Sequence, residues 1–440
     1  MKNFNAKGSF SLEKTFARYV SQNILGMLGI SAYILADTYF ISKAEGADGI
    51  TALNIVLPLY SFIFAIGSMM GTGSATRFTI SRAREEENAD FFFSNAVIFA
   101  LLFGIVFMVI GVFFPDRLMG LLGADARIVE VGAIYTRIFM LFAPFFMWNY
   151  IFNAFVRNDG APSIAMAATL SSSLFNIVMD YILMFPLKLG MAGAALATAV
   201  SPIVGISICC IHVFSGKSNF HIRAIRPSFS RLVQSCQLGV AGFVGEISSG
   251  ITTMVFNFLI LELAGNVGVA AYGIVANVAI VATAIFNGVA QGAQPLISSF
   301  HGKKDAVSSR RILRLSIGAA FVLACLVILL INLFSGPVVA LFNSEQNPDM
   351  ALYAMKGIRL YFIGFFFASA NIVGTGYLSA TEAAKWAFAA SILRGVVAIT
   401  ICAFTLSALF GMTGVWLAFP TAELLTMAVT GLGIRRSLSA

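Results

Sequence analysis

The stretch that decides the fold is KLGMAGAALAT, Lys188–Thr198, because a similar stretch occurs later in the chain. Its second copy, LFGMTGVWLAF, begins 221 residues later at Leu409, and the chain has 440 residues. Three further pairs recur at nearly the same separation: GTGSATRFTISRA (71–83) with GVAQGAQPLISSF (288–300), YTRIFMLFAPFF (135–146) with GIRLYFIGFFFA (357–368), and FVRNDGAPSIA (155–165) with YLSATEAAKWA (377–387). We therefore predict a doubled chain. Its N-lobe spans residues 1–222 and its C-lobe spans residues 223–440, with a polar, basic linker at 215–231.

The composition excludes a soluble globular protein. Hydrophobic residues make up 59% of the chain, charged residues 11%, and the mean hydropathy is +0.89. A soluble domain carries about 25% charged residues, so the chain is predicted to be a membrane protein with the lipid bilayer as its surroundings. The five Cys and three His are scattered without the spacing of a zinc site or a disulfide framework.

Twelve apolar runs have about the 20-residue length that crosses a bilayer as a helix. Their approximate ranges are 16–42, 49–75, 91–115, 129–152, 162–186, 190–214, 232–262, 268–295, 312–334, 352–378, 386–410 and 413–434. We expect an all-α membrane protein with twelve transmembrane helices in two pseudo-symmetric six-helix lobes. Because twelve is an even number, both termini lie on the same side of the membrane.

The distribution of Lys and Arg over the loops predicts on which side of the membrane the termini lie. The termini and the even-numbered loops carry about four times as many of them as the opposite loops. This bias places both termini in the cytoplasm of a multi-pass protein of the cell inner membrane. It also accounts for the net charge of +8, so the charge indicates no nucleic-acid partner.

Six helices per repeat give both lobes the same topology, related by an axis along the membrane normal. Transporters are commonly built this way, with a cavity between the lobes. The sequence has no Gly-x-Ser-x-Gly, His-Glu-x-x-His or phosphate-binding loop, so we expect no enzyme and no ATP-driven pump. It shows no ring of like charges for a channel filter. No feature requires an oligomer, so a monomer is expected.

Acidic side chains within the spans are the candidate functional residues, because a carboxylate at mid-bilayer costs about 2.5–3.5 kcal/mol on insertion scales. They are Asp37, Asp180, Glu246 and Glu423. Asn176 lies four residues before Asp180, on the same helix face. Asp180 and Thr198 each stand nine residues from the 189 turn, at a depth of roughly 13 Å. Tyr33 lies one turn from Asp37 on its helix.

The internal repeat acts as a control for these polar residues. Near the positions matching Asp37, Asn176, Asp180 and Thr198, the second half carries Phe256, Val397, Ile401 and Phe419. Polar residues that only hold helices together should be needed in both halves. Their presence in one half favours a site in the N-lobe, and the alternative is a polar cluster that satisfies its own hydrogen bonds across helices.

The sequence also resembles the multidrug and toxic compound extrusion (MATE) transporters, in particular their prokaryotic DinF-like and MepA-like members. The resemblance rests on an ordered set of segments along the whole chain: ADTYFIS (36–42), FVRNDGAPSIAM (155–166), NIVMDYIL (176–183), GMAGAALAT (190–198) and GVWLAFPTAE (414–423).

The resemblance implies two lobes in a V, alternating access, and export driven by Na+ or H+. It maps a cation site onto Asp37, Asn176, Asp180 and Thr198. Tyr33 and Asn153 are implied neighbours, and the resemblance alone nominates Asn153. Family members of the NorM type place a coupling acid on the seventh helix, where Glu246 lies. Which lobe couples therefore stays open, and we favour the N-lobe.

These observations give the functional hypothesis. The four N-lobe residues share a cation, either Na+, which prefers oxygen ligands, or a proton taken up by two adjacent carboxylates. No other metal or cofactor is expected. The substrate is expected to be an amphipathic, often cationic small molecule, and Glu246 a candidate to contact it. A lipid-linked saccharide flippase of the same superfamily is the alternative, although it would need a basic cavity. The roles of Arg394 and Glu423 stay undecided.

Overall fold

The computed structural model describes residues 9–342 and 347–439, which are helical with no strand in either range. Residues 1–8 and 440, at the ends of the predicted lobes, lie outside the described residues. The elements are α1 (Ser9–Ala83), α2 (Phe91–Phe113), α3 (Pro115–Leu121), α4 (Ala126–Leu141), α5 (Ala143–Asn158), α6 (Pro162–Met184), α7 (Gly190–Val213), α8 (Phe229–Gly302), α9 (Ala306–Leu333), α10 (Ser335–Phe342), α11 (Pro348–Tyr361), η1 (Phe362–Gly364), α12 (Phe365–Ala380), α13 (Ala384–Ile392), η2 (Leu393–Val397), α14 (Ala398–Phe410) and α15 (Met412–Ser439). The predicted all-α fold class is confirmed.

The number of spans depends on how broken helices are counted. Ten helices of the described residues are long and apolar enough to cross a bilayer, or eleven when the bent pair α4 and α5 counts as one span. This number treats the 74-residue α8 as a single span. At 1.5 Å per residue such a helix would be about 110 Å long, against a hydrocarbon core of about 30 Å. When α8 is divided at its break, each of the twelve predicted spans corresponds to a helix, half of a broken helix or a bent helix pair of the structure.

Two glycines provide the breaks at matching places in the repeat. Gly46 interrupts α1 with φ 63° and ψ −145°, and Gly265 interrupts α8 with φ 62° and ψ −159°. A glycine adopts positive φ without the steric penalty of a Cβ. Each long helix therefore turns back on itself and supplies two spans.

The predicted spans 129–152 and 352–378 are not single straight helices. The first consists of α4 and α5, bent by 48° around Phe142. Pro144 lies in the first turn of α5, where it removes a backbone donor and favours a new helix start. In the second lobe, α11 and α12 are joined by the 3-10 turn η1. The break is thus repeated, although only the first copy has a proline.

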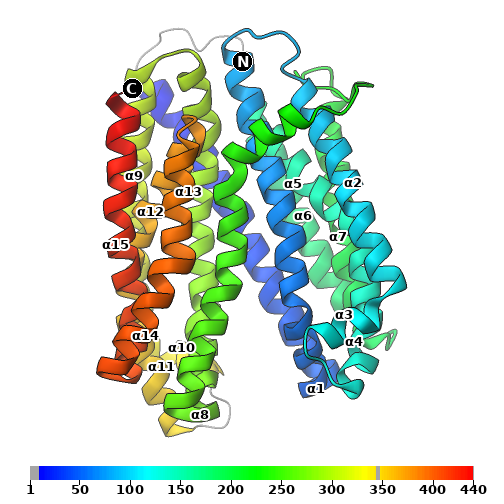
Figure 1. The fold of residues 1–440 in the computed structure, drawn as a ribbon, viewed down its shortest axis with the longest axis vertical. Coiled ribbons are helices and arrows are strands. Elements are labelled where there is room, and N and C mark those ends of the chain that lie inside the picture. The colour runs from blue at the N-terminus through cyan, green and yellow to red at the C-terminus, as the bar shows by residue number, and fades with distance from the viewer. Residues whose placement is uncertain (1–8, 343–346, 440) are drawn as a thin grey trace.

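The helices form two groups, which Figure 1 shows side by side. One apolar core runs from Ile41 to Leu232, and a second runs from Phe256 to Ala422. The second core also contains Phe16, Tyr19 and Val20 from the start of α1, so α1 begins among the C-lobe helices and then crosses to the N-lobe. The two-lobe layout is confirmed, while the boundary at 222/223 stays a prediction.

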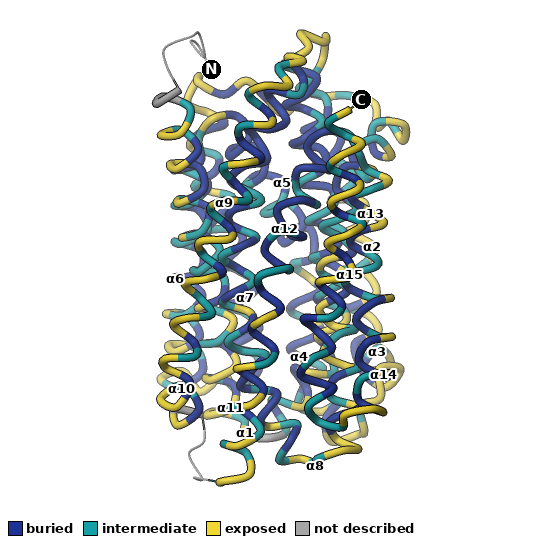
Figure 2. Tube along the Cα trace, turned by 90° about the vertical axis from the view of Figure 1, so that its left-hand side faces the viewer, coloured by how far each residue is buried: buried dark blue, intermediate teal, exposed yellow. Residues whose placement is uncertain are grey.

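The outer surface of both groups is apolar. Large hydrophobic side chains are exposed along the helices, among them Leu102 and Val106 on α2 and Val322 and Leu329 on α9. Figure 2 shows exposed and buried positions alternating along each helix. A continuous apolar exterior of this kind suits contact with lipid chains.

The lobes touch closely on the side where α1 begins and α15 ends, which we call the terminal side. A Cβ on Gly73 of α1 would lie 1.9 Å from the Ser235 carbonyl oxygen of α8, and one on Gly239 would lie 1.9 Å from that of Met69. The second crossing is similar, with Gly288 against Ile24. Small residues allow helix backbones to approach this closely in membranes.

We predict that Gly73→Ala destabilises the protein by about 1–3 kcal/mol, because the added methyl group must push two backbones apart. Thermal unfolding of the detergent-purified protein measures the effect. Gly318→Ala on α9 is the matched control, since nothing lies within 4 Å of its Cβ position. Equal stability of the two variants would contradict the close crossing.

Candidate functional site

The helical hairpin of α6 and α7 brings three of the predicted site residues together. Asn176 contacts the Thr198 hydroxyl oxygen at 3.2 Å. The amide orientation that pairs both ends of Asn176 donates to Asp180 Oδ2 (3.2 Å) and accepts from the Thr198 backbone N–H (3.3 Å). Gly193 permits this approach, because a Cβ there would lie 3.0 Å from Leu183. Asn176 thus links the carboxylate of one helix to the hydroxyl of the next.

Asp37 on α1 completes the four-residue cluster of Asp37, Asn176, Asp180 and Thr198. Asp37 interacts electrostatically with Asp180, and both side chains are buried. Asp37 Oδ1 and Asp180 Oδ1 have no hydrogen-bond partner among the described residues. No basic side chain of those residues forms an ion pair with either acid. The cluster is therefore a set of oxygens facing one another without a positive charge.

Tyrosines connect this cluster to the region between the lobes. Tyr33 interacts electrostatically with both Asp37 and Asp180, and also with Glu246 of the C-lobe. Tyr150 on α5 interacts electrostatically with Glu246 and Tyr33. Tyr135 on α4 lies beside Thr198 and close to the two aspartates, although its buried hydroxyl lacks a hydrogen bond of normal geometry. Sequence reasoning missed Tyr135 and Tyr150, whose only signal was a hydroxyl inside an apolar span.

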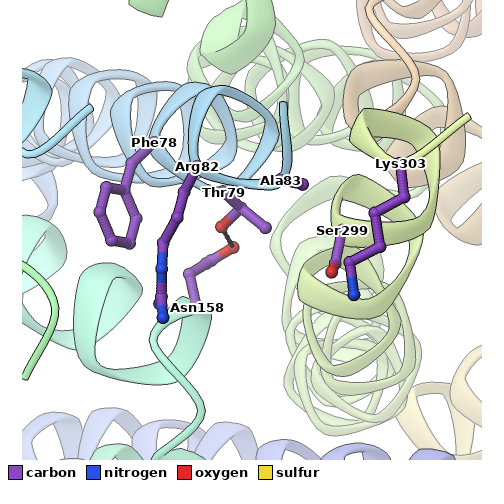
Figure 3. A pocket seen from close by; sticks show the side chains of 7 residues that line it. All are labelled: Phe78, Thr79, Arg82, Ala83, Asn158, Ser299 and Lys303. Carbon is purple, nitrogen blue, oxygen red and sulfur yellow. Dashed lines mark hydrogen bonds between the residues drawn. The ribbon is translucent and has the colours of Figure 1, made fainter. Parts of the chain in front are cut away.

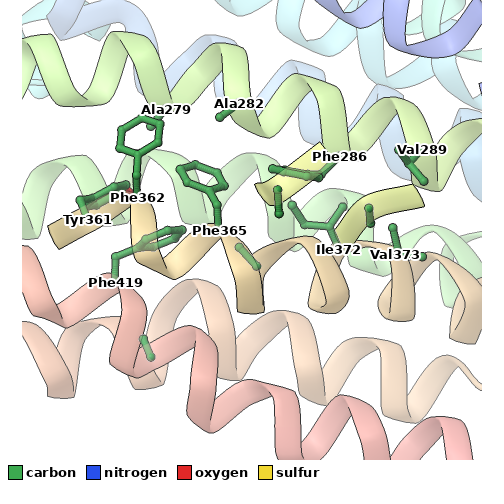
Figure 4. Packing of buried hydrophobic residues seen from close by; sticks show 14 of the residues in the cluster. Ala279, Ala282, Phe286, Val289, Tyr361, Phe362, Phe365, Ile372, Val373 and Phe419 are labelled. Carbon is green, nitrogen blue, oxygen red and sulfur yellow. The ribbon is translucent and has the colours of Figure 1, made fainter. Parts of the chain in front are cut away.

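The C-lobe fills the matching positions with packed side chains. Phe419, which matches Thr198, stacks on Tyr361 with ring centroids 4.3 Å apart (Figure 4). Phe256, near the match of Asp37, stacks on Tyr272 at 5.3 Å. These aromatic contacts are core packing and leave no oxygen cluster at those positions.

The matches of Asn176 and Asp180 lie one residue further than the sequence indicated. Val397 and Ile401 are exposed, at 41% and 58%. Ala398 and Cys402 occupy the buried face instead, at 4% and 5%. Ala398 and Cys402 carry no charge, so the C-lobe still has no carboxylate or amide at the positions that match Asn176 and Asp180.

Asn153 takes part in a different network. Its amide nitrogen donates to Thr169 Oγ1 (2.8 Å) and to the Ala165 carbonyl oxygen (3.1 Å) of α6. Its oxygen faces the buried Arg157. None of its hydrogen bonds among the described residues reaches Asp37 or Asp180, so its implied place beside the cluster stays a prediction.

The C-lobe has a polar cluster of its own, which sequence reasoning did not find. Arg394 Nε donates to Glu423 Oε1, and Asn371 Nδ2 donates to Glu423 Oε2 at 2.8 Å. Arg394 lies in η2, a single π-helical turn between α13 and α14. Insertion of a π turn rotates the helix locally, and the shift in register that it causes explains why spacing alone did not pair Arg394 with Glu423.

An ion-pair network joins the lobes on the terminal side. Glu382, in the turn between α12 and α13, pairs with Arg77 of α1 and with Arg84 just after α1, and contacts His301 of α8 at 3.0 Å. We call these four residues the Glu382 network. The His301 contact, supported by the two arginines, lowers the pKa of Glu382 to about 2. Its stabilising effect is therefore complete above pH 4.5, the ordinary value, and is lost as the pH falls through about 2.

The backbone of Glu382 also suggests a specific role for this carboxylate. Glu382 has a φ of 59°, and the matching residue in the N-lobe turn is Gly160, with a φ of 94°. A left-handed conformation is unfavourable for a residue with a Cβ. By contrast Asp159, the N-lobe turn acid, binds Arg82 and His212 of its own lobe. Of the two turn acids, only Glu382 of the C-lobe therefore forms ion pairs with the other lobe.

A small cavity of about 150 Å³ lies beside this network, between the end of α1, the end of α5 and the end of α8. Figure 3 shows Arg82 and Thr79 of α1 facing Ser299 of α8 and Lys303 just after α8 across it. Elsewhere on this side Gln294 donates to Thr76 at 2.8 Å. The terminal side is therefore sealed by polar contacts between the lobes.

The donor set of the four-residue cluster suits a hard cation. It offers carboxylate, amide and hydroxyl oxygens, the ligands that such cations prefer. The described residues contain no group of three or more His, Cys, Asp or Glu arranged to hold a metal ion. An all-oxygen set of this kind suits a hard cation better than the softer transition metals, which favour nitrogen and sulfur ligands.

Comparison with known proteins gives the family. The MatE family model matches residues 23–182 and 243–405. The chain belongs to the MATE family. It is similar to "Multidrug export protein MepA" of Staphylococcus aureus (strain MRSA252), with 30% identity over 89% of this chain and 86% of the relative. The same-named protein of Staphylococcus saprophyticus is 29% identical over the same shares of the two chains.

Solved structures agree on the fold. An outward-facing multidrug resistance MATE family transporter of the MOP superfamily superimposes with a TM-score of 0.91, at 22% identity and 99% coverage of both chains. A MOP superfamily transporter from Pyrococcus furiosus gives a TM-score of 0.90, at 21% identity, covering 98% of this chain and 97% of its own. MATE proteins are membrane transporters, so this chain is a transporter and not an enzyme.

The C-lobe ion pair of this MATE transporter, with Glu423 buried and Arg394 partly buried, gives a stability prediction. Glu423→Gln leaves the Arg394 charge without its partner, so we expect a loss of about 3 kcal/mol. The double variant Arg394→Met with Glu423→Met should lose less, because no buried charge is left unpaired. Thermal unfolding in detergent measures both. A double variant less stable than Glu423→Gln would contradict this role.

Proposed function

We propose that this MATE transporter is a cation-coupled antiporter that exports amphipathic, often cationic small molecules by alternating access. One observation carries the proposal. Asp37 and Asp180 are buried in the same lobe, interact with each other, and each has a carboxylate oxygen without a partner among the described residues. Two such acids need a neutralising cation, and none is supplied by a neighbouring side chain.

The coupling ion is Na+ or H+. Oxygens of Asp37, Asn176, Asp180 and Thr198 supply ligands for Na+. A proton shared between the two carboxylates would neutralise them equally well. In both cases binding removes the repulsion between α1 and α6 and allows α1 to repack. Coupling then arises because the ion binds one conformation of the lobes more tightly than the other.

Alternating access requires the terminal side to open and close. We propose that this side is cytoplasmic, as the distribution of Lys and Arg indicates, with the lobes dividing at residues 222 and 223. The polar contacts across it favour the state closed to the cytoplasm. Export then proceeds when these contacts break and re-form as the lobes move relative to each other.

The substrate class follows from the groups between the lobes. Tyr33, Tyr150 and Glu246 interact with one another there, and Glu246 has no recorded hydrogen bond or ion pair among the described residues. Aromatic faces and an uncompensated acid favour lipophilic cations. The name of the Staphylococcus relatives, multidrug export protein, supports a broad substrate range.

A flippase for lipid-linked saccharides is the less favoured function. It would need basic side chains facing the cavity to hold a pyrophosphate. Of the three arginines within the predicted spans, Arg137 and Arg359 are exposed, and Arg394 is paired with Glu423. The basic side chains between the lobes lie near the terminal side, where Arg157 donates to Gln291 at 3.0 Å and Arg82 and Lys303 line the small cavity.

We predict that Asp37→Asn abolishes cation-driven efflux, because the pair loses the charge that recruits the ion. The assay is transport of a fluorescent lipophilic cation by proteoliposomes, with a Na+ gradient and a pH gradient imposed in separate experiments. The gradient that drives wild-type transport identifies the coupling ion.

Asp116→Asn, on an exposed residue of α3, makes the same chemical change outside the cluster and should transport normally. Wild-type efflux by the folded Asp37→Asn variant under both gradients would refute coupling through this cluster.

We predict that Glu382→Gln opens the terminal side more often, because the charged hydrogen-bond acceptor shared by Arg77, Arg84 and His301 is lost. A cysteine placed at Ser299, in a chain whose native cysteines are replaced by serine, should react about tenfold faster with a membrane-impermeant maleimide. Glu87→Gln, an exposed loop acid without an ion pair in the described residues, is the control. Unchanged labelling of Glu382→Gln would show that the Glu382 network does not hold this side closed.

A further inference from the structure

A second charged feature of the terminal side lies away from the transport pathway. A groove of about 290 Å³ separates the first turns of α9 from the last turn of α15. Its lining residues, which we call the basic groove, are Arg310, Leu313, Arg314, Arg435, Leu438 and Ser439. Arg310 spans the groove and donates to the Leu438 carbonyl oxygen at 2.5 Å. The groove is thus a defined feature between two helices and not a scatter of surface charges.

Its positive charge is not neutralised by any acidic side chain of the described residues. No carboxylate lines the groove, and neither Arg310, Arg314 nor Arg435 forms an ion pair with any described residue. The nearest acid on α9, Asp305, caps the helix by accepting from the Ser308 backbone N–H. The amino terminus of α9 adds the partial positive charge of the helix dipole. Three guanidinium groups therefore line the groove without a counter-charge from the residues that the structure describes.

Adjacent arginines are engaged elsewhere. Arg311 pairs with Glu13 at 2.8 Å, and Arg436 lies over the Trp386 ring with its guanidinium carbon 5.0 Å from the centroid. A general shortage of partners for arginines on this side therefore does not explain the positive charge of the basic groove. Where partners exist on this side, the arginines use them.

The N-lobe shows how the matching surface is normally covered. Asp90 and Ser94 of α2 stand 220 residues before Arg310 and Arg314. The linker lies over them: Arg223 pairs with Asp90 at 2.7 Å, and its backbone N–H donates to Ser94 Oγ at 2.9 Å.

Phe220 of the same linker is fully buried between α2 and α7. Its ring centroid lies 4.6 Å from that of Phe93 and 6.2 Å from that of His212. In the C-lobe no described residue takes this place, and the charge of the surface is reversed from acidic to basic. The repeat therefore points to an occupant that is anionic and does not belong to the described chain.

The surfaces below the groove are apolar and exposed. On α9, Phe321 follows Arg314 by seven residues and is 56% exposed. On α15, Leu432 precedes Arg435 by three residues and is 52% exposed. These spacings keep each pair on one helix face. An occupant held by the arginines would therefore have hydrocarbon-facing surface directly beneath it.

We propose that the basic groove binds the phosphate headgroup of an anionic phospholipid in the leaflet on the terminal side. Guanidinium groups hold phosphate oxygens through paired hydrogen bonds, and the acyl chains would run along the apolar faces of α9 and α15. Residues 1–8 contain Lys2 and Lys7 and no acid, which disfavours them as the occupant. The cytoplasmic assignment of this leaflet rests on the proposed orientation, whereas the binding itself does not depend on transport.

The test is lipid binding by the full-length protein purified in detergent. The protein is titrated with dioleoylphosphatidylglycerol or dioleoylphosphatidylcholine, and bound lipid is counted by native mass spectrometry. We expect the wild type to retain phosphatidylglycerol selectively. Arg314→Gln combined with Arg435→Gln should bind it about 25-fold more weakly, at about fivefold for each basic residue. Lys217→Gln combined with Arg226→Gln removes the same charge from exposed linker positions and should bind like the wild type.

Further arms separate the outcomes. Arg314→Lys combined with Arg435→Lys keeps the charge and should retain selectivity with reduced affinity, which also controls for folding. Inorganic phosphate at millimolar concentration should not displace the lipid. Equal weakening in the linker variant, unchanged binding in the groove variant, or displacement by free phosphate would each overturn the proposal. Transport by the groove variant is measured separately, so loss of lipid with intact efflux leaves the antiporter function standing.

Discussion

The desolvation of two carboxylates, Asp37 and Asp180, is the constraint on which the proposed mechanism depends. Four acidic side chains are buried in the described residues, and the other two have a basic partner built into the fold. Asp159 has Arg82 and His212, and Glu423 has Arg394. An unpaired buried carboxylate is costly in a low-dielectric interior. Of these four acids, only Asp37 and Asp180 lack a basic partner among the described residues, and in the proposed mechanism a cation from solution supplies the missing charge.

Duplication explains how such a pair is tolerated. Both lobes share the broken helices, the glycine kinks and the tight crossings, so the second lobe shows what the scaffold needs for folding alone. There the positions of Asp37 and Thr198 hold Phe256 and Phe419, packed against aromatic neighbours. The C-lobe pairs its own buried acid, Glu423, with Arg394. We infer that cation binding changes the packing of one lobe, while the other serves as a rigid partner for it.

The sequence supported the lobes, the helices and the cluster because each depends on local patterns. Apolar length predicts a span, and spacing along α6 places Asn176 beside Asp180. The remaining features depend on contacts that no local pattern encodes. The π turn at Arg394 changes the register by one residue, so Glu423 could not be matched to it. Glu382 meets Arg77 across 305 positions of sequence, and Asn153, suggested by resemblance alone, bonds within its own network.

In the proposed alternating access the lobe contacts on the terminal side must break and re-form, and two opposing free-energy contributions act on them. Glu382 gains two arginine partners and a histidine contact only while the lobes are in contact, which favours closure. Arg157 is buried in the same closed state, yet its recorded partners are the neutral amides of Asn23, Asn153 and Gln291. A guanidinium without a carboxylate regains hydration when the seal opens, which favours opening. Because these terms oppose each other, the difference between the two states can be small. A preference of a few kcal/mol from a single bound cation is then enough to shift the population from one state to the other.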